Sequence, residues 1–357
     1  MPPVRPNIAD LAGYVPGEQP QTDGWCKLNT NENPYPPSPR AIEAMREAIG
    51  ERLKIYPDPD GTDFRRAAGQ LWDCSPDRIL PGNGSDDCLT ILVRAFCGPG
   101  DTLALPYPSY ILYETLARIQ GCRSRRIMLR PDWSFDLDAA REQVANAKLL
   151  FLPCPNSPSG TVWALDTVRS LIPPHGVLVL DEAYADFADE PLGPKLLAAV
   201  QGTDEAKRVV VTRTLSKSYS LAGLRIGYAV ADEAIIAELR KVKDSYNCDA
   251  VSLAGGAAAL RDQTYAADVI ARIRATRGRL TAAVRNLGFD AVDSQANFVW
   301  TQHPSGEHQR IFDGLKERRI LVRHMRYPDA GLEGLRLSVG SDEEADRLIA
   351  ALAEIVA

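Results

Sequence analysis

The sequence contains no Cys-x-x-Cys pair, which argues against a zinc site and against a disulfide framework. Seven cysteines, an odd number, are instead scattered along the chain, at Cys26, Cys74, Cys88, Cys97, Cys122, Cys154 and Cys248. Scattered thiols are typical of a reducing compartment, so we expect free cysteines and a cytoplasmic protein.

Histidine is scarce as well. Of the four histidines, only His303 and His308 lie close together in the sequence. They fall in a polar stretch that favours a solvated loop over a metal site. We therefore expect no bound metal.

Long apolar runs and an excess of basic residues are both missing. No window approaches the roughly 20 apolar residues that cross a membrane, and the first residues lack the apolar core of a signal peptide. The chain has 41 Lys and Arg against 47 Asp and Glu, for a net charge of −6. We expect no membrane or nucleic-acid partner, so any anionic ligand must be met by local arginines.

The composition is that of an ordinary globular protein, with 45% hydrophobic and 25% charged residues in a chain of 357. That length suggests two domains, or one large domain with a smaller partner. Residues 1–40 are rich in Pro, Asn and Gly and predict an extended N-terminal arm. Its aromatic residues Tyr14, Trp25 and Tyr35 favour a docked arm over the alternative of a disordered tail.

Four apolar runs, at 102–105, 149–152, 177–180 and 209–212, are separated mostly by helical segments. This alternation predicts an α/β fold, in which a mostly parallel sheet is covered by helices on both faces. A polar cluster follows each run, at the strand ends where such sheets bind ligands. We expect this large domain to span residues 41–245.

The pattern changes after about Lys243. An alanine-rich helical stretch at 251–287, with a break in it, precedes apolar strands at 296–301, 320–323 and 335–339 and a final helix at 342–356. Strands of mixed spacing with flanking helices predict a smaller α+β C-terminal domain, residues 246–357.

A single lysine, Lys217, lies between two serines just after the apolar run that ends near Thr212. A lysine amine at a strand end can form a Schiff base or act as a base once burial lowers its pKa. The alternative is a solvated surface lysine. Small and apolar flanking residues favour the catalytic interpretation, and Arg225, eight positions on, could bind an anion.

Two further strand ends carry polar groups. In the turn at 82–87, two glycines allow a close backbone approach, and Ser85 and Asp86 place free N–H groups at a helix start, as phosphate sites do. A structural turn and cap explains this turn equally well. Asp181 ends an apolar run, so its carboxylate must pair with a cation or lose its charge; a helix cap is the alternative.

Together these residues resemble the fold type I pyridoxal-phosphate aminotransferases, and within them the histidinol-phosphate aminotransferase branch. The resemblance covers nearly the whole chain. The motifs that carry it are NTNENP, YPD, GNGSD, PNSPSG, DEAY, TLSK and LAGLRIG, at residues 29–34, 56–58, 82–86, 155–160, 181–184, 214–217 and 221–227.

The resemblance implies pyridoxal 5′-phosphate as the cofactor. Lys217 would hold it as a Schiff base and move the proton at the substrate's Cα. Asp181 would pair with the ring nitrogen. Tyr184 would hydrogen-bond the ring oxygen O3′, and Tyr110 would stack on the ring. The residues implied to bind the phosphate are Gly84, Ser85, Asp86, Ser216 and Arg225.

The resemblance also implies substrates and a partner. Arg336 would grip the substrate's anionic group, with Arg323, Tyr14 and Asn33 as further substrate contacts. Tyr56 would reach the cofactor phosphate of a neighbouring subunit, which implies a homodimer.

The chain departs from the family pattern Pro-Asn-Asn-Pro-Thr-Gly, because Ser157 precedes the proline. Either Asn156 or Ser157 could then face O3′. We expect Asn156, since an amide is the better donor to a phenolate-like oxygen and the serine side chain is shorter.

The implied reaction is transamination, with histidinol phosphate as amino donor and 2-oxoglutarate as acceptor. An aromatic amino-acid aminotransferase or a threonine-phosphate decarboxylase-like enzyme would share every cofactor motif. A pyridoxal-phosphate-binding regulator without turnover is a third interpretation. Such regulators usually carry a basic DNA-binding module, for which this chain has neither the length nor the charge.

Overall fold

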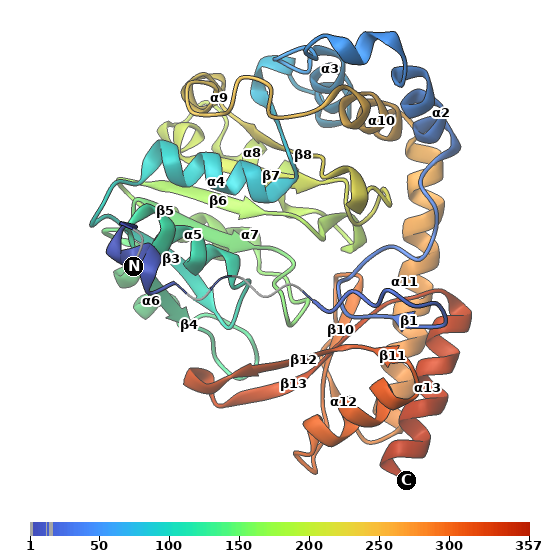
Figure 1. The fold of residues 1–357 in the computed structure, drawn as a ribbon. Helices are drawn as coiled ribbons and strands as arrows, with labels where there is room; N and C mark the ends of the chain where they lie inside the picture. Colours follow the sequence, from blue (N-terminus) through green and yellow to red (C-terminus); the bar gives the residue numbers. More distant parts are fainter. Residues whose placement is uncertain (1–2, 12, 14–16) are drawn as a thin grey trace.

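The computed structural model describes residues 3–11, 13 and 17–357 and confirms the α/β fold (Figure 1). Within these residues, the large sheet has the strand order β2-β8-β7-β6-β5-β3-β4. The five adjacent strands β7, β6, β5, β3 and β4 run parallel to one another. Strand β8 is antiparallel to both of its neighbours, β7 and β2. The strands are β2 Ile79–Gly82, β3 Thr102–Tyr107, β4 Arg123–Met128, β5 Leu149–Pro153, β6 Val177–Asp181, β7 Val209–Thr214 and β8 Gly227–Ala231.

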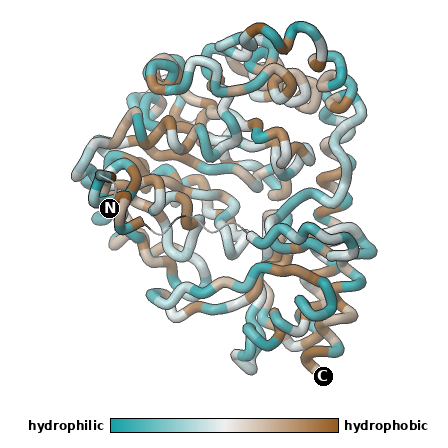
Figure 2. Tube along the Cα trace, viewed as in Figure 1, coloured by the Kyte–Doolittle hydropathy of each residue, from teal (hydrophilic) through white to brown (hydrophobic). Residues whose placement is uncertain are grey.

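Successive residues of the central strands alternate between the two faces of this sheet. Leu150 and Leu152 of β5 pack into one hydrophobic core, and Leu149 and Phe151 pack into the other. Because both faces are covered, every residue of β5 and β6 is buried, which explains the continuous apolar runs of the sequence. Figure 2 shows hydrophobic residues recurring along these layers and hydrophilic residues in the outer loops.

Helices cover each face of the large sheet. The first core includes residues of α6 Leu137–Val144, α7 Leu165–Ser170 and α8 Leu192–Val200. The second includes residues of α4 Ser85–Phe96, α5 Leu112–Gln120 and α9 Glu233–Arg240. This two-sided cover leaves the strand ends as the accessible part of the sheet.

Two strands differ from what the apolar runs predict. Strand β4 contains three arginines and lies at the edge of the sheet, where charged side chains protect an unpaired edge, so it has no apolar signature. The mostly apolar residues from Leu224 to Val230 also suggest a strand, but β8 begins only at Gly227. Before it, Ala222–Leu224 forms a short 3-10 turn and Arg225 has a φ of 51°.

A smaller antiparallel sheet has the order β12-β13-β10-β9 in the described part of the chain. Its strands are β9 Asp290–Ala291, β10 Phe298–Gln302, β12 Arg323–Tyr327 and β13 Leu332–Ser338, and helices α11 Gln263–Asn286, α12 His308–Glu317 and α13 Asp342–Val356 pack around it. The arm includes the short helix α1 Pro6–Ala9 and joins this domain, since β1 Cys26–Lys27 pairs in parallel with β11 Ile320–Leu321.

The expected break in the alanine-rich stretch is confirmed at Asp262, between α10 Ala250–Arg261 and α11. Helix α10 packs beside α2 Pro39–Ala48 and α3 Thr62–Trp72 (Figure 1). Gly255 and Gly256 allow this approach, because an added Cβ would lie 2.6 Å from Met45 and 2.8 Å from Phe64. Helix α10 therefore follows the predicted domain boundary at residue 245, although it packs against α2 and α3 of the predicted large domain. The next helix, α11, leads on to the small sheet.

None of the helices in the described ranges combines the length and the apolar character that a membrane span requires.

Candidate active site

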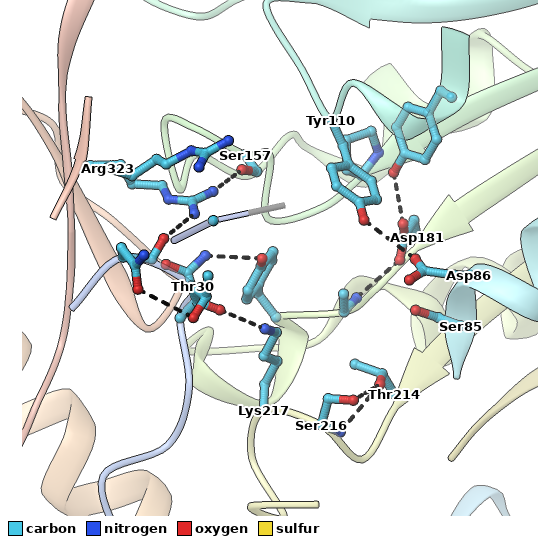
Figure 3. Close-up of a pocket in the computed structure, with 18 of the residues that line it drawn as sticks. Thr30, Ser85, Asp86, Tyr110, Ser157, Asp181, Thr214, Ser216, Lys217 and Arg323 are labelled. Atoms are coloured by element: carbon cyan, nitrogen blue, oxygen red, sulfur yellow. Dashed lines mark hydrogen bonds between the residues drawn. The ribbon is translucent and has the colours of Figure 1, made fainter. Parts of the chain in front are cut away.

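A cavity of about 170 Å³ lies where the carboxyl ends of the large-sheet strands face the arm and the small sheet. Ligands bind at this edge in open α/β sheets. In Figure 3, Asp181, Asp86 and Ser85 lie on one side of the cavity, and Arg323 and Ser157 lie on the other. The lining residues are Gly17, Asn29, Thr30, Asn31, Ser85, Asp86, Tyr110, Tyr113, Pro153, Ser157, Asp181, Ala183, Tyr184, Thr214, Ser216, Lys217, Arg225, Arg323 and Arg336.

Lys217 points into this cavity rather than into solvent. Its Nζ donates a hydrogen bond of 3.0 Å to the Thr30 carbonyl oxygen and lies 5.9 Å from the centre of the Tyr184 ring. Burial, reinforced by the nearby Arg336 cation, lowers the pKa of Lys217 to about 8. The amine therefore releases its proton far more readily than an exposed lysine does.

Asp181 is a buried carboxylate at the end of β6, only 4% exposed. It accepts hydrogen bonds from the Tyr113 hydroxyl at 2.7 Å, the Ala183 N–H at 3.2 Å and the Thr212 hydroxyl at 3.3 Å. None of the ion pairs of the described residues involves it. Burial therefore raises its pKa to about 6, and a cationic ligand group would restore the charged form.

The start of α4 forms an anion-binding corner with Arg225. Gly84, the residue before the helix, has a φ of 83°, and an added Cβ there would lie 2.9 Å from the Arg225 guanidinium. Arg225 also lies 3.2 Å from the Asp86 carboxylate. Unpaired N–H groups at a helix start and a guanidinium both bind phosphate.

Hydroxyl groups from the end of β7 complete that corner. The Thr214 hydroxyl donates to the Ser216 Oγ at 3.0 Å and accepts from the Ser216 N–H at 3.2 Å. Both residues line the cavity, as do Ser85 and Asp86. Thr214 belongs to the TLSK motif at 214–217, but its role in the site was not predicted from the sequence.

Arg336 comes from β13 of the small sheet and reaches across to the large domain. Its guanidinium donates to the Ser157 Oγ at 3.0 Å and to the Asn29 carbonyl oxygen at 3.1 Å. Its Nε is buried and has no hydrogen-bond partner among the described residues. Arg323 lines the same cavity, whereas Tyr14 lies outside the described residues.

The expected orientation of Asn156 differs from the observed one. Asn156 is fully buried and hydrogen-bonds Ser109, Pro108 and Ser159, and it does not line the cavity. Ser157 lines it instead. The Asn156 side chain makes its hydrogen bonds to neighbouring loop residues, because buried polar groups need partners, and it is therefore not directed into the cavity.

Three other predicted site residues have distinct positions. Tyr110 lines the cavity, with its hydroxyl 3.4 Å from the Asp86 carboxylate. Asn33 does not line it, and its amide donates to the Lys217 carbonyl oxygen at 2.8 Å, so it contacts the lysine's backbone. Tyr56 is 77% exposed and stacks on Tyr246 with ring centres 4.3 Å apart, away from the cavity lining.

Sequence reasoning missed Tyr113 and Asn31. Tyr113 is a buried residue of α5 whose hydroxyl hydrogen-bonds Asp181. In the sequence, nothing distinguishes it from a tyrosine that only fills the core. Asn31 did carry a signal, because it lies in the NTNENP motif and asparagine tolerates the left-handed conformation that it adopts, with a φ of 56°.

Comparisons with known proteins place these observations in a family context. The family model for class I and II aminotransferases matches residues 23–352. The histidinol-phosphate aminotransferase of Rhodopirellula baltica is 48% identical over 96% of this chain and 92% of its own length. That of Geobacter sulfurreducens is 45% identical over 99% of each chain. The solved structure of the histidinol-phosphate aminotransferase from Sinorhizobium meliloti in complex with pyridoxal-5′-phosphate superposes with a TM-score of 0.89, at 27% identity, over 100% of this chain and 98% of that one.

Proposed function

The chain belongs to the family of class I and II aminotransferases, and we propose from this that it transfers the amino group of histidinol phosphate to 2-oxoglutarate. The proposal that histidinol phosphate is the amino donor rests on the 48% identity, over nearly the whole chain, to a histidinol-phosphate aminotransferase. The reaction would serve histidine biosynthesis, and the scattered, unpaired cysteines fit a cytoplasmic enzyme.

Pyridoxal 5′-phosphate is the cofactor of this enzyme, and the cavity has a group for each of its parts. Arg225 and the start of α4 suit the phosphate. The buried Asp181 carboxylate, which has no cationic partner among the described residues, suits the protonated ring nitrogen. Lys217 is the amine within the cavity that would hold the aldehyde carbon. When bound, the cofactor supplies an electron sink for bond breaking at the substrate's Cα.

Lys217 is the proposed proton carrier of the reaction. With a pKa of about 8, its amine can both accept and return a proton near neutral pH, as a general base and acid must. Arg336 contributes to that low pKa, so the residue proposed to bind the substrate also tunes the lysine. Asp181 and Tyr113 together keep a negative charge ready for the ring nitrogen.

Arg336 and Arg323 are the proposed anchors for the anionic groups of both substrates. A guanidinium binds phosphate and carboxylate in the same two-point geometry. The phosphate of histidinol phosphate and a carboxylate of 2-oxoglutarate can therefore use the same cationic end of the cavity in turn.

The homodimer is part of the proposal. Tyr56 lies in a cluster of exposed apolar side chains, which is unusual on a monomer's surface. The members are Ile49, Leu53, Ile55, Tyr56 and Tyr246, exposed by 60%, 54%, 54%, 77% and 46%. A second subunit would cover this cluster, and its cofactor phosphate would then receive Tyr56.

The test compares Lys217→Ala with the wild type on histidinol phosphate, phenylalanine and threonine phosphate, each with and without 2-oxoglutarate. We expect histidinol phosphate to be the best donor and the variant to lose about a thousandfold in kcat, because nothing replaces the lysine's proton transfer. Lys241→Ala, at an exposed lysine, is the control and should behave as the wild type. Near-normal turnover by Lys217→Ala, or a better donor among the other two, would contradict the proposal.

A further inference from the structure

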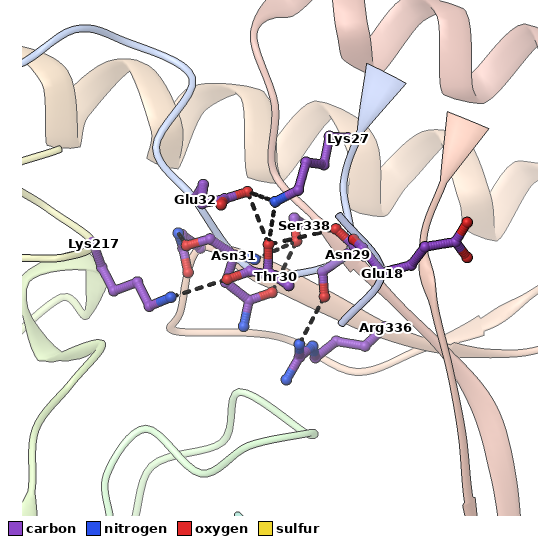
Figure 4. A network of polar contacts seen from close by, with 10 residues as sticks. Glu18, Lys27, Asn29, Thr30, Asn31, Glu32, Lys217, Arg336 and Ser338 are labelled. Atoms are coloured by element: carbon purple, nitrogen blue, oxygen red, sulfur yellow. Dashed lines mark hydrogen bonds and ion pairs between the residues drawn. The ribbon is translucent and has the colours of Figure 1, made fainter. Parts of the chain in front are cut away.

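Asn31 joins the two sheets directly beside the cavity. It is 1% exposed, and its amide nitrogen donates to the Tyr184 hydroxyl at 3.0 Å. The backbone carbonyl oxygen of Asn31 accepts from the Asn297 side-chain amide at 3.0 Å. Figure 4 shows it next to Ser338, between Lys217 and Arg336.

Ser338 fixes which way the Asn31 amide faces. The Ser338 hydroxyl accepts from the Asn31 backbone N–H at 2.9 Å and donates to the Asn31 Oδ1 at 2.9 Å. If the amide were turned over, the hydroxyl hydrogen of Ser338 would lose this acceptor. Since Ser338 is only 2% exposed, water could not easily replace it, and an unpaired buried donor is costly.

The orientation of the Asn31 amide determines the direction of the Tyr184 proton. An amide N–H can only donate, so the Tyr184 oxygen must accept from Asn31. The hydroxyl's own hydrogen must then point elsewhere. No acceptor for it occurs among the described residues, and Tyr184 lines the cavity.

We propose that Asn31 is a positioning residue that, held in one orientation by Ser338, aims the hydroxyl hydrogen of Tyr184 into the cavity. This inference rests on the proposed function, because the acceptor in the cavity would be the phenolic ring oxygen of the cofactor. Asn31 acts through Tyr184 and does not itself perform chemistry.

The charges around Tyr184 are compatible with this role. Burial raises the pKa of Tyr184, which keeps its hydroxyl protonated as a donor, and Arg336 opposes that shift. Asp181 and Asp86 raise the same pKa, and the Lys217 amine lies 5.9 Å from the ring. A hydroxyl that donates to the ring oxygen favours the oxygen's deprotonated form.

The test is Asn31→Asp in the holoenzyme. Aspartate tolerates the left-handed backbone of this position and can still accept from Ser338. Its second oxygen cannot donate, so Tyr184 would turn its hydrogen toward the carboxylate and away from the cavity. We expect the pH midpoint of the bound cofactor's visible absorbance to rise by about one unit, and kcat to fall about tenfold.

The same substitution in a Tyr184→Phe background separates proton direction from added charge. The carboxylate's charge acts in both backgrounds, but only the tyrosine has a hydrogen to redirect. We expect a larger rise of the midpoint in the Tyr184 background. Ser338→Ala, which frees the amide to turn, should raise the midpoint by a smaller amount.

Equal shifts in the two backgrounds, or no shift in an active Asn31→Asp holoenzyme, would overturn this inference alone. A wild-type chain that binds no pyridoxal phosphate would overturn the proposed function, and this inference with it. A fall in melting temperature without any movement of the midpoint would mark Asn31 as merely structural and would also overturn the inference.

Discussion

At the residue scale, Asp181 shows how a residue of the proposed site can lower the stability of the folded protein. Its folded-state pKa is about 6 against an ordinary 3.8, because burial disfavours the charge. A group with a raised folded pKa contributes its full stability below the ordinary pKa, and this contribution is lost as the pH rises through about 6. The cofactor-free protein therefore carries an unfavourable charge at neutral pH.

Asp181→Asn should stabilise the cofactor-free protein above pH 6. The asparagine oxygen can accept from Thr212 and Ala183 as Asp181 Oδ1 does, and its amide can donate to the Tyr113 oxygen. We expect a gain of up to about 3 kcal/mol at pH 8 that disappears near pH 4, measured by urea unfolding. The variant should also lose most of its turnover, because the ring nitrogen has no anionic partner. Equal unfolding free energies at pH 8 would contradict this account.

At the scale of elements, the turn from β2 into α4 depends on one glycine. Gly84 has a φ of 83° and a ψ of 166°, a conformation open essentially to glycine alone. Its missing side chain also leaves room for Arg225. The turn therefore couples the backbone of a helix start to the arginine of the proposed phosphate site.

Gly84→Ala should weaken cofactor binding at least about tenfold, because its Cβ displaces the Arg225 guanidinium, and a charge-assisted hydrogen bond contributes this much. Gly202→Ala is the matched control. Gly202 also has a positive φ, of 76°, but an added Cβ there meets no atom within 4 Å. Both variants should lose stability, of order 1–3 kcal/mol, and only the first should show a raised Kd in a cofactor titration. Equal cofactor affinities would refute the steric argument.

Elements were predictable where their signal was local. The apolar runs located β3, β5, β6 and β7. Ser38 followed by Pro39 is also a local signal for a helix start, and α2 begins there, with the Ser38 hydroxyl accepting from the Arg40 N–H. The start of α3 lacks a comparable local signal. Thr62 and Asp63 are the residue types that usually cap a helix, but Gly61 occupies the cap position. The Asp58 carboxylate accepts from the Thr62 N–H from four residues away, which a cap pattern does not encode.

At the scale of the whole molecule, the proposed dimer makes each site depend on two chains. Tyr56 projects from an exposed apolar cluster instead of lining its own cavity. If it serves the neighbouring subunit, two different defects in two chains can complement each other.

Mixing Tyr56→Ala with Lys217→Ala should restore activity. In a mixed dimer, one site combines an intact Lys217 with an intact Tyr56 of the partner chain. Random pairing makes half of the dimers mixed, so activity should recover to about a quarter of the wild-type value. The assay is run at limiting cofactor, where each variant alone is nearly inactive. Recovery no greater than the sum of the two separate variants would show that Tyr56 does not act across an interface.

The sequence by itself determined which residues end the strands. Lys217 and Asp181 each follow an apolar run, and parallel strands bring their carboxyl ends to one edge, so their meeting in one cavity was predictable. These residues are also those that the family motifs name.

Only the tertiary structure decided the contacts between segments that are distant in the chain. Asn31 meets Ser338 across 307 positions and Tyr184 across 153, and Arg336 reaches Ser157 from another sheet. Nor could the sequence decide between Asn156 and Ser157, because both fit the same loop. The physical reason is that a polar side chain turns toward whichever partner satisfies it, and those partners are supplied by the packing of remote elements.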